Sequence, residues 1–198
     1  MSINTPKISV INFASSNKNK LKELQYIFRE HLINIEIRQF NIDLPEVQGE
    51  PEDVVKFKLE FAIKNANNLD GAILVEDTSL GFNAYGGLPG VYIKYFLDKI
   101  KPEGLYKMAS AFDDHCGYAQ SIYGLQNNIN EPPKIFIGKT DGEIVQPRGN
   151  NSFGWDSCFQ PKGYTKTYAE MEEKEKNLIS HRSKSTKLMI DWLKSQIN

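Results

Sequence analysis

The chain of 198 residues has only two cysteines, Cys116 and Cys158, and no CxxC pair. Two thiols are too few for a disulfide framework, so we expect both to be structural thiols in a reducing compartment. An excess of basic charge is also missing, because 24 Lys and Arg residues are offset by 25 Asp and Glu residues. Nucleic acids and membrane surfaces attract proteins through basic charge concentrated on one face. The composition therefore predicts neither as a partner.

Long apolar runs are absent as well. No run approaches the roughly 20 residues that a membrane helix requires. The N-terminal sequence MSINTPKISVINFASS has no apolar signal core and no Arg-rich amphipathic pattern. We therefore expect a cytoplasmic protein without membrane segments. The length favours one sizeable core, so residues 1–198 are predicted to form a single domain.

The common phosphate-binding motifs GxxxxGK[ST] and GxGxxG are missing too. A polar turn is predicted instead at 15–20, between a strand over 7–13 and a helix that follows. A helix N-terminus offers N–H groups and the positive end of its dipole to an anion, and Lys20 adds a positive charge. An ordinary N-cap explains the polar residues more readily, so both interpretations stay open.

The stretch from Leu74 to Tyr92, LVEDTSLGFNAYGGLPGVY, is the most informative part of the sequence. The apolar run 72–75 predicts a buried strand that ends at Glu76 and Asp77. Adjacent carboxylates repel each other and raise one pKa unless a cation or an acid/base role holds them there. A divalent metal is the simplest such cation. An ordinary strand, hairpin and turn explains the stretch equally well.

Two lysines lie within apolar patterns. Glu46 stands in a loop rich in proline and glycine, and a helix that begins near Pro51 places Lys58 on its apolar face. Lys94 stands among the apolar and aromatic residues of 92–96. Each lysine must extend outward to solvent or meet an anion.

A hairpin is predicted further along the chain. Asp141-Gly142 separates two β-type runs, and this dipeptide favours a type I′ turn.

An aromatic loop follows at 153–156, where Phe153 and Trp155 precede Asp156. If the rings are exposed, they can stack on a flat base, and Asp156 can accept a hydrogen bond from it. The alternative is that both rings fill the core.

Acids, lysines in apolar surroundings, a polar strand-to-helix turn and aromatic rings are together the parts of a nucleotide polyphosphate site. The chain also resembles the inosine triphosphate pyrophosphatase family, in its eukaryotic form. The resembling blocks are LPEVQGEP (44–51), LVEDTSLGFNAYGGLPGVYIKYFL (74–97), KPEGLY (101–106), PRGNNSFGWDSCFQPKGY (147–164), TYAEM (167–171) and EKNLISHR (175–182). They run in family order and cover most of the chain.

The resemblance implies roles for individual residues. It implies catalytic roles for Asp77, Glu46 and Lys20, with Mg²⁺, or alternatively Mn²⁺, bound through Glu46 and Asp77. Glu76 is expected to tune Asp77 rather than bind the metal. Ser16 stands where the family has a glycine. The substrate-binding residues that the resemblance implies are Ser15, Ser16, Asn17, Lys18, Asn19, Lys20, Lys58, Asp77, Thr78, Lys94, Phe153, Gly154, Trp155, Asp156, Lys176, His181 and Arg182.

The implied activity is hydrolysis of ITP, dITP or XTP to the monophosphate and pyrophosphate, which cleanses the nucleotide pool. The expected partner is the small-molecule triphosphate, and the resemblance implies a homodimer. We expect an α/β fold with a long twisted mixed β-sheet, flanked by helices in two lobes with a central cleft. The alternatives are a non-hydrolysing nucleotide sensor on the same scaffold and a related pyrophosphatase for modified pyrimidines.

Overall fold

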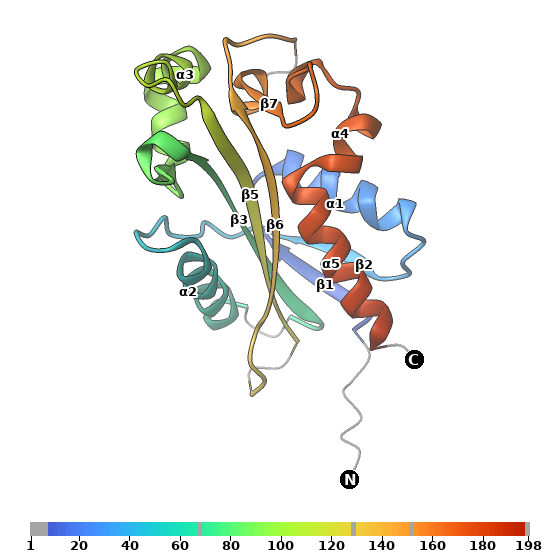
Figure 1. Ribbon diagram of the computed structural model, residues 1–198. Coiled ribbons are helices and arrows are strands. Elements are labelled where there is room, and N and C mark those ends of the chain that lie inside the picture. Colours follow the sequence, from blue (N-terminus) through green and yellow to red (C-terminus); the bar gives the residue numbers. More distant parts are fainter. Residues whose placement is uncertain (1–7, 67–68, 128–129, 151–152, 197–198) are drawn as a thin grey trace. The chain divides into compact units, whose positions relative to one another are not determined.

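The computed structural model describes residues 8–66, 69–127, 130–150 and 153–196 (Figure 1). Its helices and strands follow in the order β1 (Val10–Ala14), α1 (Lys18–Glu30), β2 (Glu36–Phe40), α2 (Pro51–Lys64), β3 (Ala72–Phe82), β4 (Pro89–Gly90), α3 (Ile93–Ala109), β5 (Cys116–Gln126), β6 (Lys134–Ile144), β7 (Phe159–Pro161), α4 (Glu173–Ile179) and α5 (His181–Ser195). The predicted alternation of helices and strands is therefore present.

The strands belong to a seven-stranded mixed sheet with the order β2-β1-β3-β5-β6-β7, and β4 pairs with β3. Strand β1 runs parallel to β2 and to β3, whereas β4 is antiparallel to β3 and β7 is antiparallel to β6. The predicted α/β fold with a mixed sheet is thus confirmed.

The chain divides into two compact units, which agrees with the two predicted lobes. Unit 1 contains residues 1–77, 122–137 and 183–198, and unit 2 contains residues 78–121 and 138–182. Because the dividing points fall inside β3, β5 and β6, these three strands contribute residues to both units.

The core of unit 1 lies on both faces of its part of the sheet. Leu74 of β3 belongs to an apolar cluster with buried residues of α1 and α5, such as Leu24 and Met189. Its neighbour Val75 belongs to a different cluster, together with Leu59 of α2. Successive residues of β3 therefore face different helices, as the two-residue period of a strand requires.

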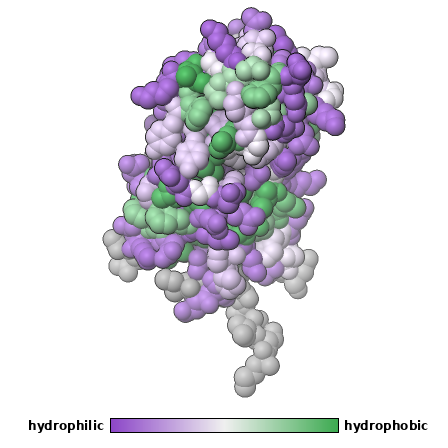
Figure 2. Space-filling model, turned by 60° about the vertical axis from the view of Figure 1, so that its left-hand side comes forward, coloured by the Kyte–Doolittle hydropathy of each residue, from purple (hydrophilic) through white to green (hydrophobic). Residues whose placement is uncertain are grey.

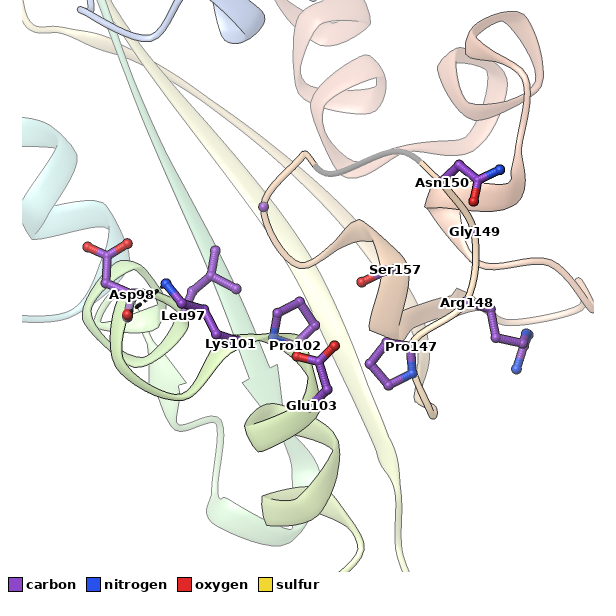
Figure 3. A pocket seen from close by; sticks show the side chains of 11 residues that line it. Leu97, Asp98, Lys101, Pro102, Glu103, Pro147, Arg148, Gly149, Asn150 and Ser157 are labelled. Carbon is purple, nitrogen blue, oxygen red and sulfur yellow. Dashed lines mark hydrogen bonds between the residues drawn. The ribbon is translucent and has the colours of Figure 1, made fainter.

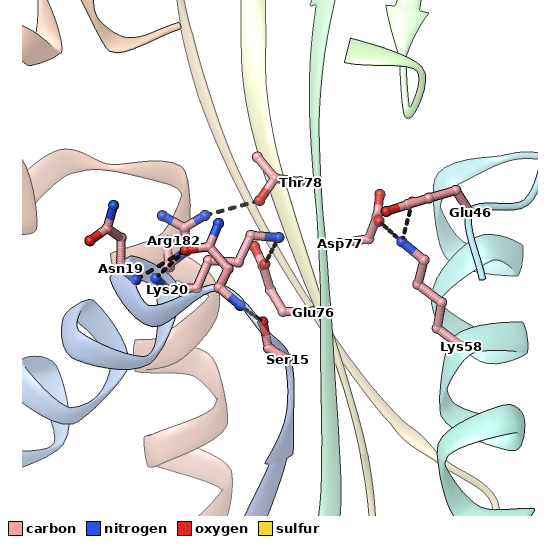
Figure 4. A network of polar contacts seen from close by, with 10 residues as sticks. Ser15, Asn19, Lys20, Glu46, Lys58, Glu76, Asp77, Thr78 and Arg182 are labelled. Carbon is pink, nitrogen blue, oxygen red and sulfur yellow. Dashed lines mark hydrogen bonds and ion pairs between the residues drawn. The ribbon is translucent and has the colours of Figure 1, made fainter. Parts of the chain in front are cut away.

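The prediction that the strand ends at Glu76 and Asp77 was wrong. Strand β3 continues through both acids to Phe82, and Leu80 and Phe82 are buried beyond them. The strand can continue because the side chains of Glu76 and Asp77 point to opposite faces of the sheet (Figure 4).

The predicted hairpin at Asp141-Gly142 was also wrong, because β6 runs through both residues without a turn. Gly142 lies opposite Pro161 of β7. A Cβ atom at Gly142 would collide with the carbonyl oxygen of Gln160. The glycine therefore permits a close approach of two strands rather than a tight turn.

The surface is largely hydrophilic on the face that Figure 2 shows, with patches of apolar side chains between the polar ones. The large apolar side chains of unit 2 that are exposed include Leu88, Tyr95, Phe96, Ile100 and Phe112. In the part of the chain that the structure describes, none of the helices combines the length and the apolar character that crossing a membrane requires.

Candidate active site

The polar turn predicted at 15–20 lies between β1 and α1, as expected. Asn17 is the N-cap of α1, and its side-chain Oδ1 accepts hydrogen bonds from the N–H groups of Asn19 at 3.0 Å and Lys20 at 3.2 Å. The Ser15 hydroxyl accepts a hydrogen bond from the N–H of Asn17 at 3.1 Å. The N-cap interpretation is therefore confirmed for Asn17. These three N–H groups thus already donate to side chains of the turn itself.

One buried ion pair of unit 1 joins this turn to the sheet. Lys20 Nζ lies 2.5 Å from Glu76 Oε2, and the Glu76 side chain is 0% exposed (Figure 4). The first turn of α1, in which Lys20 lies, contains no acidic residue. Glu76 of β3 supplies a counter-charge to this lysine.

A second charged cluster, formed by Glu46, Lys58 and Asp77, lies on the other face of β3. Lys58 Nζ donates hydrogen bonds to Asp77 Oδ1 at 2.6 Å and to Glu46 Oε2 at 2.9 Å (Figure 4). The Lys58 side chain is only 6% exposed. Of the two outcomes predicted for this lysine, contact with an anion is confirmed, and the anions are carboxylates of the chain itself.

The electrostatics of this cluster favour a charged lysine and penalise an isolated carboxylate. Burial raises the pKa of Asp77, and although Lys58 and Lys20 act in the opposite direction, the pKa stays above its usual range. Burial alone would lower the pKa of Lys58, but contacts with Asp77 and Glu46 outweigh it and raise the pKa. A further cation near Asp77 would thus be stabilised by the ionised carboxylate.

The donor set of the cluster fits Mg²⁺. Among the residues described, no group of three or more His, Cys, Asp and Glu side chains is placed to hold a metal ion. Glu46 and Asp77 nevertheless converge on one point, because both contact the same ammonium group. Mg²⁺ commonly binds through one or two carboxylates, with water and substrate phosphates as its other ligands. The cluster therefore suits a metal ion that arrives together with phosphate rather than one held in an all-protein cage.

Unit 2 carries the predicted aromatic residues. Trp155 is only 7% exposed and packs in the core of this unit, so of the two alternatives the core one is confirmed for it. Asp156 begins a 3₁₀ turn that leads into β7. Phe153 is half-buried. The role of this loop in binding a base stays a prediction.

His181 is buried between two aromatic side chains. Its ring centroid lies 5.4 Å from that of Trp155 and 5.9 Å from that of Tyr168, with interplanar angles of 34° and 28°. Tyr168 was not among the predicted site residues, although it belongs to the resembling block TYAEM. It limits how the His181 ring can turn, since the two rings are stacked.

A buried ion pair lies beside these rings. Lys176 Nζ lies 2.6 Å from Asp156 Oδ2, and the two side chains are 7% and 5% exposed. The ammonium also lies 5.1 Å from the ring centroid of Phe153 and 5.4 Å from that of Tyr168, within the range of cation–π attraction. Lys176 is therefore the buried member of a charge run that is otherwise largely solvated.

Arg182 is also buried, and its Nη2 donates a hydrogen bond to Thr78 Oγ1 at 3.0 Å (Figure 4). The end of α4, just before His181, is fixed by Thr140 of β6, whose hydroxyl donates to the Ile179 carbonyl oxygen at 2.8 Å. No local pattern in the sequence indicated Thr140, because its partner lies 39 residues away.

Of the two outcomes predicted for Lys94, extension outward to solvent is confirmed. Lys94 is the second residue of α3 and is exposed rather than enclosed by its aromatic neighbours. Residues adjacent in a helix point in different directions, so Ile93 is buried while Lys94 is exposed. Its predicted role in substrate binding does not depend on burial and stays a prediction.

A separate cavity of about 510 Å³ lies within unit 2 (Figure 3). Of the predicted site residues, Gly154 is the one that lines it. Lys101, in the kink of α3, has a left-handed φ of 59°, and its Nζ donates to the Asp98 carbonyl oxygen at 2.9 Å. The residues that line the cavity are Leu97, Asp98, Lys101, Pro102, Glu103, Pro147, Arg148, Gly149, Asn150, Gly154 and Ser157.

Comparison with known proteins gives one family and several similar structures. The model of the Ham1 family matches residues 11–192. A HAM1 protein from Coxiella burnetii is 27% identical with a TM-score of 0.82, over 94% of this chain and 98% of that chain. The Staphylococcus aureus Ham1 protein is 23% identical with a TM-score of 0.73, over 94% and 99% of the two chains. A nucleoside-triphosphatase / dITP/XTP pyrophosphatase from Mycobacterium abscessus is 23% identical with a TM-score of 0.69, over 93% and 99%.

Proposed function

Because the chain belongs to the Ham1 family, we propose that it hydrolyses noncanonical purine nucleoside triphosphates to the monophosphate and pyrophosphate. The observation that carries this proposal is the Lys58 ammonium, held between the carboxylates of Glu46 and Asp77. The activity agrees with that of the similar Mycobacterium abscessus protein, a dITP/XTP pyrophosphatase. Since the family match spans both units, we propose that they act as a single pyrophosphatase domain.

In this proposal the residues of unit 1 handle the phosphates and the metal. Glu46 and Asp77 would hold Mg²⁺, which supplies neutralisation of charge on the phosphate oxygens. One of these two carboxylates orients the attacking water and accepts its proton. As the water oxygen bonds to the α-phosphorus, the bond from this phosphorus to the bridging oxygen breaks, and pyrophosphate leaves with that oxygen. Lys20 and Lys58 balance the negative charge of the triphosphate, together with the polar side chains of the turn 15–20.

The residues of unit 2 bind the remainder of the substrate. Phe153 offers a ring to the base, and Arg182 and His181 are the donors proposed for the 6-position. A 6-oxo group, as in ITP, dITP and XTP, can accept a hydrogen bond from such donors, whereas the 6-amino group of ATP is itself a donor and offers them no acceptor. Arg182 and His181 are only 3% and 2% exposed, so water has little access to relieve this mismatch. ATP is therefore expected to be a poor substrate.

Three finer statements belong to the same proposal. We propose Mg²⁺ as the preferred cofactor with Mn²⁺ as its substitute, a cytoplasmic location, and a homodimer. The exposed apolar side chains of unit 2, among them Tyr95 and Phe96 of α3, are of the kind that subunit interfaces cover.

The test of the proposal is release of pyrophosphate from ITP in the presence of Mg²⁺. We expect pyrophosphate and IMP in equal amounts and comparable turnover of dITP and XTP. Turnover of ATP should be lower by at least about 100-fold, because its 6-amino donor meets the buried donors of the site. Release of orthophosphate instead of pyrophosphate would contradict cleavage at the α-phosphorus.

The same assay separates the alternatives. A nucleotide sensor would bind ITP, measurable by calorimetry, without releasing pyrophosphate. A pyrophosphatase for modified pyrimidines would prefer such triphosphates over ITP when both are tested at equal concentration. The proposal requires turnover of ITP to exceed that of every pyrimidine triphosphate in the panel.

A further inference from the structure

Glu76 is an unexpected residue at its position in β3. The four residues before it, Ala72 to Val75, are apolar and buried, and Glu76 continues this buried run with 5% exposure. A buried ion pair rarely stabilises a protein more than apolar side chains of similar size would, because both charges lose their hydration. Stability alone therefore does not explain a carboxylate at this position.

The two acids of β3 have different partners. Glu76 contacts Lys20 of α1, whereas Asp77 contacts Lys58 of α2, and the two pairs lie on opposite faces of the strand (Figure 4). The Glu76 carboxylate is thus directed away from Lys58 and from the carboxylates proposed to bind metal. The charge of Glu76 contributes to raising the pKa of Asp77, as expected, but its direct contact is with Lys20.

Lys20 stands where a lysine is unfavourable without a partner. It lies in the first turn of α1, at the positive end of the helix dipole, where acids are favoured over cations. A free lysine side chain also has many rotamers, and a ligand that binds it must offset the loss of that conformational entropy. The contact with Glu76, at 2.5 Å, both supplies a counter-charge and restricts the side chain of Lys20, which keeps 19% exposure.

From these observations we propose that Glu76 is a positioning residue that holds Lys20 ready for a phosphate group of the substrate. This inference rests on the proposed function, because it assigns Glu76 a role in binding the triphosphate. Glu76 itself touches neither substrate nor metal in this proposal. It acts through Lys20, and its effect must therefore disappear when Lys20 is removed.

The test is a double-mutant cycle with Glu76→Gln, Lys20→Met and the double variant. For ITP we expect Glu76→Gln to raise KM about tenfold with kcat within about threefold, since loss of pre-ordering weakens binding before chemistry. In the Lys20→Met background, the same change should alter kcat/KM by less than about twofold. The proposal is overturned if Glu76→Gln lowers kcat/KM for ITP equally in the wild-type and Lys20→Met backgrounds, or if it lowers it in neither.

A binding measurement keeps this test separate from the proposed activity. Titration calorimetry measures the affinity for inorganic triphosphate, without metal, of the wild type, the two single variants and the double variant. We expect Glu76→Gln to weaken this affinity in the wild-type background and to leave it nearly unchanged in the Lys20→Met background. If the wild-type protein releases no pyrophosphate from ITP, the proposed function fails, while the calorimetric cycle still decides whether Glu76 acts through Lys20.

A control variant and a measurement of the unfolding midpoint exclude a purely structural effect. Asp70→Asn changes a carboxylate of unit 1 that pairs with Arg38 at 2.8 Å on the surface, and it should leave KM within about twofold, because exposed pairs contribute little. If Glu76→Gln does not fold, Glu76→Asp replaces it in the cycle. A variant that lowers the unfolding midpoint without changing the affinity for triphosphate shows a structural role and overturns the proposal.

Discussion

Among its described residues, the protein contains two similar buried lysine–aspartate pairs, which are Lys58–Asp77 in unit 1 and Lys176–Asp156 in unit 2. Each has an N–O distance of 2.6 Å, and none of the four side chains is more than 11% exposed. Their surroundings differ. Lys58 also contacts a second carboxylate, that of Glu46, whereas Lys176 lies beside aromatic rings.

These surroundings limit what each pair can do. In unit 1 the positive charge of one lysine is shared by two carboxylates, so an additional cation finds ligands and an incoming phosphate finds a lysine. In unit 2 the lysine contacts the carboxylate of Asp156, lies near two aromatic rings and is only 7% exposed. The Lys58–Asp77 pair thus suits binding of metal and phosphate during a reaction. The Lys176–Asp156 pair suits a binding pocket with a fixed shape.

The largest expected effect comes from removing the charge of Asp77. We expect Asp77→Asn to lower turnover of ITP with Mg²⁺ by about 10³-fold or more, because it removes one of two proposed metal ligands. The fold should persist. Lys58 would keep its hydrogen bond to the Glu46 carboxylate at 2.9 Å, so the variant leaves no buried ammonium without a counter-charge.

Pyrophosphate release and thermal unfolding together measure this effect. Asp53→Asn on α2 is the matched control, since it alters an exposed carboxylate 3.4 Å from Lys56 in the same unit. Near-normal hydrolysis of ITP by the Asp77 variant would refute the assignment of the charged cluster to catalysis.

The next effect separates the two pairs directly. Lys58→Met should lower kcat/KM for ITP and ATP by the same factor, because Lys58 meets groups that all triphosphates share. The double variant Lys176→Met/Asp156→Asn, which leaves no unpaired buried charge, should raise KM for ITP by roughly 10- to 100-fold, about 1.4 to 2.7 kcal/mol. The double variant should also lower the ratio of kcat/KM for ITP to kcat/KM for ATP.

The readout for these variants is the ratio of kcat/KM values for ITP and ATP. The comparison of the two pairs fails if Lys58→Met changes this ratio more than the double variant of unit 2 does.

The smallest effect is expected at Lys94. Because this lysine is exposed, Lys94→Ala should leave the unfolding midpoint unchanged and raise KM for ITP by about 5- to 10-fold through loss of one phosphate contact. Lys99→Ala, at an exposed position on the same helix, is the control. An unchanged KM in the Lys94 variant would remove this residue from the proposed binding site.

Local patterns in the sequence predicted those features whose physical cause is local. The apolar spacing and the capping residues before it placed α1, and Pro51 marked the start of α2. The same kind of spacing correctly placed Lys58 on a buried helix face. Long resembling blocks pointed to the family that the match over residues 11–192 confirms.

Other features depend on contacts between residues far apart in the chain. Asp141-Gly142 forms part of a strand because β7 pairs with it, and Trp155 is buried because Phe159 and Tyr168 pack against it. A dipeptide preference or an aromatic motif contains no information about such neighbours.

The two acids of β3 illustrate the same division. The sequence alone established that adjacent carboxylates need positive charge nearby. The fold was needed to show that lysines supply it, and that Glu76 and Asp77 use different ones on opposite faces of the strand. The reason is that the two-residue period of a strand is visible in sequence, whereas the helix that covers each face is brought there by the folded core.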